Sequence, residues 1–230
     1  MDRPDNEAED LAGALDDIRL TNRYLGGRRA LLYGLAPHLA SHAGNARVEI
    51  LDVGTGGADL PVAMVRHARR VGLEARVIAV DLDPAVTDLA ARAVAGHRGI
   101  RVIRADALSL PFRDGAFDVV TASMFLHHFD GPGIVRLLAE FRRVARRAVV
   151  INDLRRHLLP WGFIYLAARL TRRAPMYVHD APLSVLRGFT DEELASAARE
   201  AGVSEPRVER RWPFRLVLTL PGAGNGGRPS

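Results

Sequence analysis

The stretch Ile50–Met64, "ILDVGTGGADLPVAM", decides the fold of this 230-residue chain. An apolar run of strand type ends in a glycine-rich bend, and a segment of helical character follows it. Gly54, Gly56 and Gly57 allow positive φ and let a ligand approach the backbone without a Cβ in the way. In doubly wound sheets, ligands lie at the carboxyl ends of strands where the strand order switches. The bend therefore predicts a binding site for a nucleoside-containing ligand.

The segments around the bend alternate between strand and helix. Strands are predicted at 48–53, 76–81, 100–104, 117–123 and 147–152, and helices near 58–71, 84–95 and 132–146. Strands that are apolar almost throughout are buried on both faces, and this alternation is typical of a parallel sheet between helices. Right-handed crossovers then make the sheet doubly wound and Rossmann-like. A capping box at Thr190 and Glu193 opens a further helix, and 206–211 and 214–220 are predicted as an antiparallel edge pair.

We expect a single domain made of five segments. Helical periodicity starts at Leu11, and Tyr24 and Arg28 are expected to cover the ligand from the N-terminal side. The segments are a helical cap (1–46), a cofactor-binding core (47–153), a lid or acceptor-binding insertion (154–189), a C-terminal helix with antiparallel strands (190–220) and a flexible tail (221–230).

Composition excludes several classes of protein. The absence of cysteine excludes disulfides, thiolate nucleophiles and Cys-ligated zinc. The longest uncharged apolar run, 158–168, is too short to span a bilayer, and the acidic N-terminus lacks the apolar region of a signal peptide. The net charge is +5, and arginine supplies all of the strong positive charge because the chain has no lysine. The arginines are spread along the chain rather than clustered as in a nucleic-acid binder. We expect a cytoplasmic protein without a nucleic-acid partner and without a membrane span.

Acidic residues after the strands indicate which ligand the bend holds. A dinucleotide fingerprint would place its third glycine at Asp59, where a carboxylate repels pyrophosphate, so the bend suits a cationic cofactor without phosphate. Asp81 ends the second strand and can accept both hydroxyls of a ribose. Asp106 follows the third strand and can accept from an adenine amine, with Ala107 and Leu108 packing on the ring. The alternatives are a solvated strand-end aspartate at 81 and a simple turn aspartate at 106.

Four motifs in order carry a family resemblance. The stretches "ILDVGTGGADL", "VIAVDLDPAV", "RVIRADALSLPF" and "FDVVTASMFLHHF" resemble the successive motifs of the class I S-adenosylmethionine-dependent methyltransferases. The small-molecule branch, with its ubiquinone/menaquinone-type and type 11/25-like enzymes, is the most similar, and the resemblance covers about residues 48–152. It implies a seven-stranded sheet whose last strand is antiparallel, and S-adenosylmethionine as the cofactor.

The resemblance also implies the cofactor-binding residues. Ser123 and Met124, at the end of the fourth strand, face the reacting methyl group. The resemblance implies that the methionine moiety is bound by Asp52, Gly54, Gly56 and Gly57. The ribose would be bound by Asp81, and the adenine by Leu82, Asp106 and Ala107.

The acceptor is expected to be small, apolar and aromatic, of the phenol, quinol or polyketide type, and O-methylation is favoured. His127 resembles the base of many small-molecule O-methyltransferases. His128, His157 or no residue at all remain alternatives, and Asp153 is expected to orient His157 or to contact the acceptor. No group of residues has metal-ligand spacing, so no metal is expected. C- or N-methylation and a non-catalytic cofactor-binding partner protein stay open, as do contact with a membrane surface by 158–168 and the oligomeric state.

Overall fold

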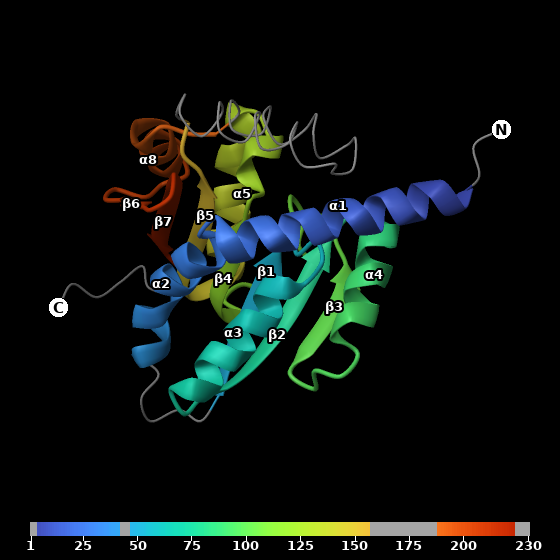
Figure 1. Cartoon of the computed structure of the whole chain (residues 1–230). Coiled ribbons are helices and arrows are strands. Elements are labelled where there is room, and N and C mark those ends of the chain that lie inside the picture. Colours follow the sequence, from blue (N-terminus) through green and yellow to red (C-terminus); the bar gives the residue numbers. More distant parts are fainter. Residues whose placement is uncertain (1–3, 42–46, 157–187, 224–230) are drawn as a thin grey trace.

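The structure, a computed structural model, describes residues 4–41, 47–156 and 188–223 (Figure 1). Its centre is a seven-stranded sheet with the order β3-β2-β1-β4-β5-β7-β6. The first five strands pair in parallel, and β7 is antiparallel to both of its neighbours. The strands are β1 (Arg47–Val53), β2 (Glu74–Asp81), β3 (Ile100–Arg104), β4 (Phe117–Ser123), β5 (Ala145–Leu154), β6 (Arg207–Arg211) and β7 (Arg215–Pro221).

This topology confirms the predicted doubly wound, Rossmann-like sheet with an antiparallel last strand. The predicted antiparallel edge pair is also confirmed, because β6 and β7 pair antiparallel at one edge of the sheet. The later strand, β7, lies between β5 and β6, so β6 is the outermost strand. The sequences of the two strands fit these positions. The apolar β7 is buried along almost its whole length, and the charged β6 is partly exposed.

Helices cover both faces of the sheet, as predicted. The helices α2, α3 and α4 pack on one face, and α5 and α8 pack on the other. Thr190 and Glu193 form the predicted capping box at the start of α8. The helices are α1 (Pro4–Tyr24), α2 (Gly27–Ala40), α3 (Asp59–Arg70), α4 (Pro84–Val94), the short 3₁₀ helix η1 (Leu126–His128), α5 (Gly131–Val144) and α8 (Asp191–Glu200). Helix α1 thus begins earlier than the periodicity at Leu11 had predicted.

Alternating residues of each strand serve two separate cores. Ile50 faces α2 and α3, where it packs in a cluster with Leu35 and Met64. The next residue, Leu51, faces α5 and packs in a second cluster with Phe141. Both clusters are closed to solvent, so the sheet is held from each side by its own apolar layer. This rigid frame fixes where the strands end.

The strand order reverses at β1, which pairs with β2 on one side and β4 on the other. The glycine bend after β1 and the loop after β4 consequently start side by side at the carboxyl edge of the sheet. Figure 1 shows the long helix α1 running across this edge, from the α2 side to α4. The candidate site is therefore enclosed by two loops and one helix.

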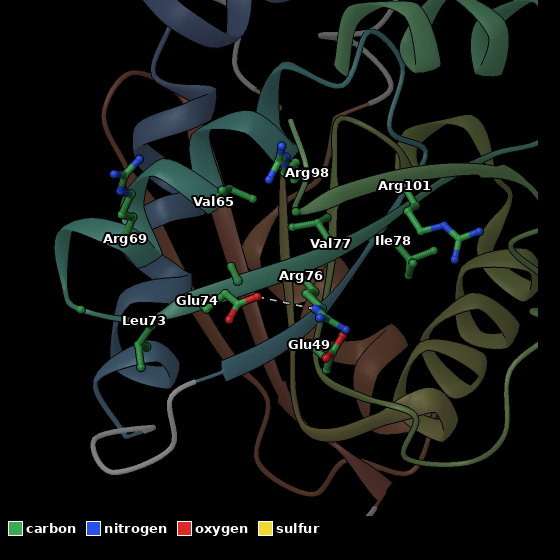
Figure 2. A pocket seen from close by; sticks show the side chains of 13 residues that line it. Glu49, Val65, Arg69, Leu73, Glu74, Arg76, Val77, Ile78, Arg98 and Arg101 are labelled. Atoms are coloured by element: carbon green, nitrogen blue, oxygen red, sulfur yellow. Dashed lines mark ion pairs between the residues drawn. The ribbon is translucent and has the colours of Figure 1, made fainter. Parts of the chain in front are cut away.

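An open groove lies at the other end of the sheet, where the parallel strands begin (Figure 2). It has a volume of about 840 Å³ and is formed by the beginnings of β1, β2 and β3 and by the end of α3. Its charged side chains include Arg69, Arg98 and Arg101, and an ion pair joins Arg76 to Glu74 with an N–O distance of 3.7 Å. None of the predicted site residues lines this groove, so it is separate from the candidate site.

Several predictions fall outside the residues that the structure describes. These are the helix at 158–168, His157, and most of the insertion 154–189 and of the tail 221–230. The division of the chain into five segments stays a prediction. Within residues 4–41, 47–156 and 188–223, no helix has the length and apolar character needed to cross a membrane.

A glycine in α2 permits close packing on the sheet and yields a test of the fold. A Cβ at Gly34 would lie 2.7 Å from a Val150 methyl and 2.8 Å from a Val217 methyl. We expect Gly34→Ala to lower the free energy of unfolding by about 1–3 kcal/mol, because the gain in helix propensity is smaller than the cost of overpacking. Chemical denaturation measures this change.

Gly13→Ala in α1 is the matched control. A Cβ at Gly13 would meet no atom within 4 Å, so the same substitution should stabilise the protein by roughly 0.5–1 kcal/mol. Equal effects at the two positions would contradict the close seating of α2.

Candidate functional site

The bend after β1 is a tight left-handed turn tied to the neighbouring strand. Gly54 and Gly56 have φ values of 68° and 51°, a region that only glycine adopts without cost. The amides of Gly54 and Thr55 both donate to the carbonyl of Val80 at the end of β2. Ala58, just before α3, is also left-handed with φ 56°, which costs about 1 kcal/mol in a residue with a Cβ. The sequence analysis missed this third left-handed position because an alanine occupies it.

Asp81 faces the bend. One of its carboxylate oxygens accepts from the amide of Gly56 at 3.1 Å, and the other accepts from the amide of Asp83 at 3.3 Å. The side chain stays partly exposed, so each oxygen keeps a lone pair for a ligand. The structure therefore places Asp81 where a ribose ligand is expected, although this role stays a prediction.

The residues predicted for the adenine lie along the same edge. Leu82 exposes 58% of its surface, which leaves its side chain available to a planar ligand. Asp106 is exposed, and its Oδ1 accepts from the amide of Leu108 at 2.9 Å. It therefore stabilises a turn, which is the alternative to adenine binding named in the sequence analysis. Its other carboxylate oxygen makes no further bond in the described part of the chain, and the buried Ala107 follows directly. The adenine-binding role stays a prediction.

Helix α1 is anchored on the bend by polar residues that the sequence analysis missed. An Nη of Arg19 donates to the carbonyl of Gly57 at 2.8 Å. One turn later, the Asn22 side chain lies beside the carboxylate of Asp59 at the start of α3 and acts to lower its pKa. Arg19 and Asn22 are three positions apart and lie on one side of the helix, but Asp17, Thr21 and Arg23 around them are also polar, so the sequence alone did not single them out.

Two residues of the N-terminal helices were expected to cover the ligand. Tyr24 is 68% exposed and packs beneath the guanidinium of Arg23. Arg28 is exposed on α2, and its charge acts to lower the pKa of Asp59 at the start of α3. That these two residues cover a ligand stays a prediction, whereas the hydrogen bond to the bend comes from Arg19.

Asp52 is an interior carboxylate at the foot of the bend. It is 2% exposed, and the hydroxyl of Thr121 donates to its Oδ1 at 2.8 Å. Burial raises its pKa to about 7, and the nearby carboxylates of Asp59 and Asp81 act in the same direction. Burial likewise raises the pKa of Asp59. Three acidic groups thus surround the bend, and the deepest of them lacks a cation.

Asp153, at the end of β5, is equally buried but has the opposite environment. It accepts from the amides of Leu126 at 2.9 Å and Leu154 at 2.7 Å and, more weakly, from that of Phe125 at 3.2 Å. Burial alone would raise its pKa, but the hydrogen bond and charge of His127, the amide of Leu154 and the charge of Arg215 outweigh it, so the pKa lies below its usual range.

His127 is held by this carboxylate. Its Nδ1 lies 2.8 Å from Oδ1 of Asp153, and the imidazole is almost completely buried. Asp153 thus holds His127, a pairing that the sequence analysis did not predict; the expectation that it orients His157 stays a prediction, because His157 lies outside the described residues. A carboxylate at Nδ1 fixes the proton there and leaves Nε2 as the basic nitrogen. The ring of the exposed His128 stacks on His127 at 4.3 Å between centroids.

The end of β4 lies beside this pair. Ser123 is buried, and its hydroxyl oxygen accepts from the Asn152 amide at 2.7 Å, which directs the hydroxyl proton elsewhere. Met124 follows with a left-handed φ of 56°. A fully buried arginine, Arg215, donates to the Met124 sulfur and to the carbonyl of Leu25. Arg215 was not identified from the sequence, because a single arginine in a predicted strand is usually a solvated charge.

The chemistry of these groups fits S-adenosylmethionine. The bend offers a partly exposed carboxylate for a diol and two further carboxylates, the buried Asp52 and the half-buried Asp59. Burial raises the pKa of both, and a ligand that carries positive charge would lower it again. A pyrophosphate would be repelled by the same three carboxylates. Among the residues described, no three His, Asp or Glu side chains gather into a metal cluster.

Comparisons with known proteins show what this chain is similar to. A family model described as a methyltransferase domain matches residues 50–148. The chain is 32% identical over 148 residues to the demethylmenaquinone methyltransferase of Thermobifida fusca, covering 62% of this chain and 59% of that protein. It is 34% identical over 86 residues to the ubiquinone/menaquinone biosynthesis C-methyltransferase UbiE of Idiomarina loihiensis, covering 35% of this chain and 32% of that protein. The chain thus spans less than two thirds of these relatives.

Solved structures confirm the fold. A putative S-adenosyl-L-methionine-dependent methyltransferase from Methanococcus maripaludis superposes with a TM-score of 0.62, covering 90% of this chain and 91% of that chain. At 13% identity, this likeness concerns the fold alone.

The contrast between the two buried aspartates leads to a pH prediction. Because the folded pKa of Asp52 is about 7 and lies above its unfolded value, wild type should lose stability as pH rises from about 4 to about 7. We expect Asp52→Asn to remove this loss and to raise the free energy of unfolding by roughly 2–4 kcal/mol at pH 8, with a smaller gain at pH 5. Urea denaturation of the ligand-free protein at both pH values measures it.

Asp153→Asn is the counterpart with the opposite sign. Its depressed pKa stabilises the fold above the unfolded pKa, and this contribution is lost as pH falls through the folded value. The variant should therefore be less stable than wild type at pH 8. If both substitutions shifted stability in the same direction, the assigned environments would be wrong.

Proposed function

We propose that this chain, whose residues 50–148 form a class I S-adenosylmethionine-dependent methyltransferase domain, transfers a methyl group from that cofactor to a hydroxyl of a small, apolar aromatic or quinol-type acceptor. The observation that carries the proposal is the position of Asp81, whose carboxylate faces the glycine bend and hydrogen-bonds the Gly56 amide. A carboxylate that can accept hydrogen bonds from a diol thus lies beside the glycine bend, at the point where the strand order switches.

Each part of the cofactor has a candidate partner in the chain. Asp81 would accept the ribose hydroxyls, and Leu82 with Asp106 and Ala107 would flank the adenine. Asp52, buried without a cation, would gain from the positive charge of the amino acid portion. When bound, the cofactor supplies an electrophilic methyl group on a sulfonium, so the protein's task is alignment and proton removal.

His127 and Asp153 support transfer to oxygen. A phenol near its usual pKa of about 10 is a weak nucleophile at neutral pH, and a base within hydrogen-bond reach assists it. With its Nδ1 held by Asp153 at 2.8 Å, His127 would accept the hydroxyl proton at Nε2. The carboxylate would stabilise the resulting imidazolium, which shares its buried surroundings. His127 is our candidate catalytic residue.

Transfer to carbon is the second candidate. The relative from Idiomarina loihiensis is named a C-methyltransferase, and it matches the core of this chain. An activated quinol ring carbon uses the same alignment and depends less on a base. We further propose that the protein acts in the cytoplasm on a small molecule, without nucleic acid as a partner.

Asp81→Ala tests cofactor binding. We expect the dissociation constant for S-adenosylmethionine to rise about 10- to 100-fold by isothermal titration, because a buried diol loses a charged acceptor. Asp88→Ala, which removes an exposed carboxylate from α4, is the control and should bind like wild type. Indistinguishable binding by the two variants would contradict the proposed site.

His127→Gln tests the base. On a panel of phenols and reduced naphthoquinones with ¹³C-methyl cofactor, we expect methoxy products and a loss of kcat of about 100-fold or more in this variant. The control His128→Gln should retain most of the activity. A ring-methyl product with little loss in His127→Gln would favour carbon transfer. Tight cofactor binding with no turnover on any acceptor would favour the non-catalytic alternative.

A further inference from the structure

An aromatic ring lies directly on the first glycine of the bend. A Cβ built on Gly54 would come 2.8 Å from Cγ and Cε2 of Phe125 and would contact Cδ2 as well. The ring thus occupies the space that any side chain at position 54 would need. Gly54 is required here for two reasons, its positive φ and this close approach.

The ring is held in place by its own loop. The amide of Phe125 donates to Asp153 at 3.2 Å, and the preceding Met124 takes the left-handed conformation that turns the chain back over the bend. Phe129 supports the ring from one side, with 5.2 Å between centroids and 58° between planes. Phe125 remains partly exposed, so one part of the ring is open to a ligand.

Carboxylates lie around the bend that the ring covers. They are Asp52, Asp59 and Asp81; the charges of Arg19 and Arg28 act on Asp59, whereas the nearby charges that act on Asp52 are the carboxylates of Asp59 and Asp81. An aromatic face carries the negative part of the ring quadrupole and attracts cations that are weakly hydrated. A sulfonium is such a cation, whereas the thioether left after methyl transfer is neutral.

We propose that the Phe125 ring contacts the sulfonium of S-adenosylmethionine and makes the bend prefer the cationic donor over its neutral thioether product. The inference rests on the proposed function and adds to it a residue that discriminates donor from product. Once the methyl group has left, the sulfur is neutral and the ring no longer attracts it. The product is therefore replaced more readily by fresh S-adenosylmethionine. Phe125 is therefore a specificity residue, whereas His127 acts on the acceptor.

The test compares two ligands that differ in charge. Isothermal titration with S-adenosylmethionine and with S-adenosylhomocysteine is carried out on wild type, Phe125→Leu and the control Phe129→Leu. We expect Phe125→Leu to bind the donor about 3- to 10-fold more weakly and the product within twofold of wild type. In Phe129→Leu the ratio of the two affinities should stay at the wild-type value.

A shape-preserving replacement guards against repacking. Phe125 replaced by 3,4,5-trifluorophenylalanine keeps the ring but withdraws its π density, and it should weaken donor binding without affecting the product. Equal weakening of both ligands would overturn the proposal, as would tighter binding of both in Phe125→Leu, the result expected if the ring only obstructs the bend. Failure of the proposed function is distinct, because wild type would then bind neither ligand.

Discussion

The carboxylate of Asp153 is the group on which the candidate site depends. It lies wholly inside the protein and accepts hydrogen bonds from three backbone amides and one imidazole. Two of the amides belong to the residues that follow β4, so one side chain on β5 shapes the neighbouring loop and orients His127 on it. An interior charge is costly unless it is fully bonded, and here the bonding both stabilises it and positions the loop. Phe125 and His127 owe their places to the same acceptor.

The two halves of the site differ in how their charge is balanced. On the acceptor side, Asp153 is compensated by donors and by the buried Arg215, and its pKa is depressed. On the side of the glycine bend, Asp52 accepts a hydrogen bond from the Thr121 hydroxyl, and burial raises its pKa. The carboxylates of Asp59 and Asp81 act on Asp52 in the same direction, whereas the charges of Arg19 and Arg28 act on Asp59. A cation bound beside Asp52 would lower its pKa again.

Most of the fold was predictable because its cause is local. The strand at 117–123 was placed correctly in full, since a short, largely apolar stretch with β-branched residues between turns has few alternative interpretations. The position of Asp81 beside the bend followed from its place at the end of a strand. The pairing of Asp153 with His127 was not predictable, because the two residues are 26 positions apart and meet only through strand register. The contact of Phe125 with Gly54 likewise depends on the left-handed Met124, a conformation that a methionine does not indicate.

The insertion of β7 has a consequence for biosynthesis. The donor half of the site lies within one continuous stretch, so a nascent chain can form it early. The acceptor half is different, because Arg215 on β7 reaches back to the carbonyl of Leu25, 190 residues away, and β7 covers the free side of β5. A translation product that stops before Arg215 would keep the glycine bend while presenting an unpaired strand edge to other chains. Truncated copies of this protein should therefore aggregate or be degraded rather than persist in a form that binds the cofactor.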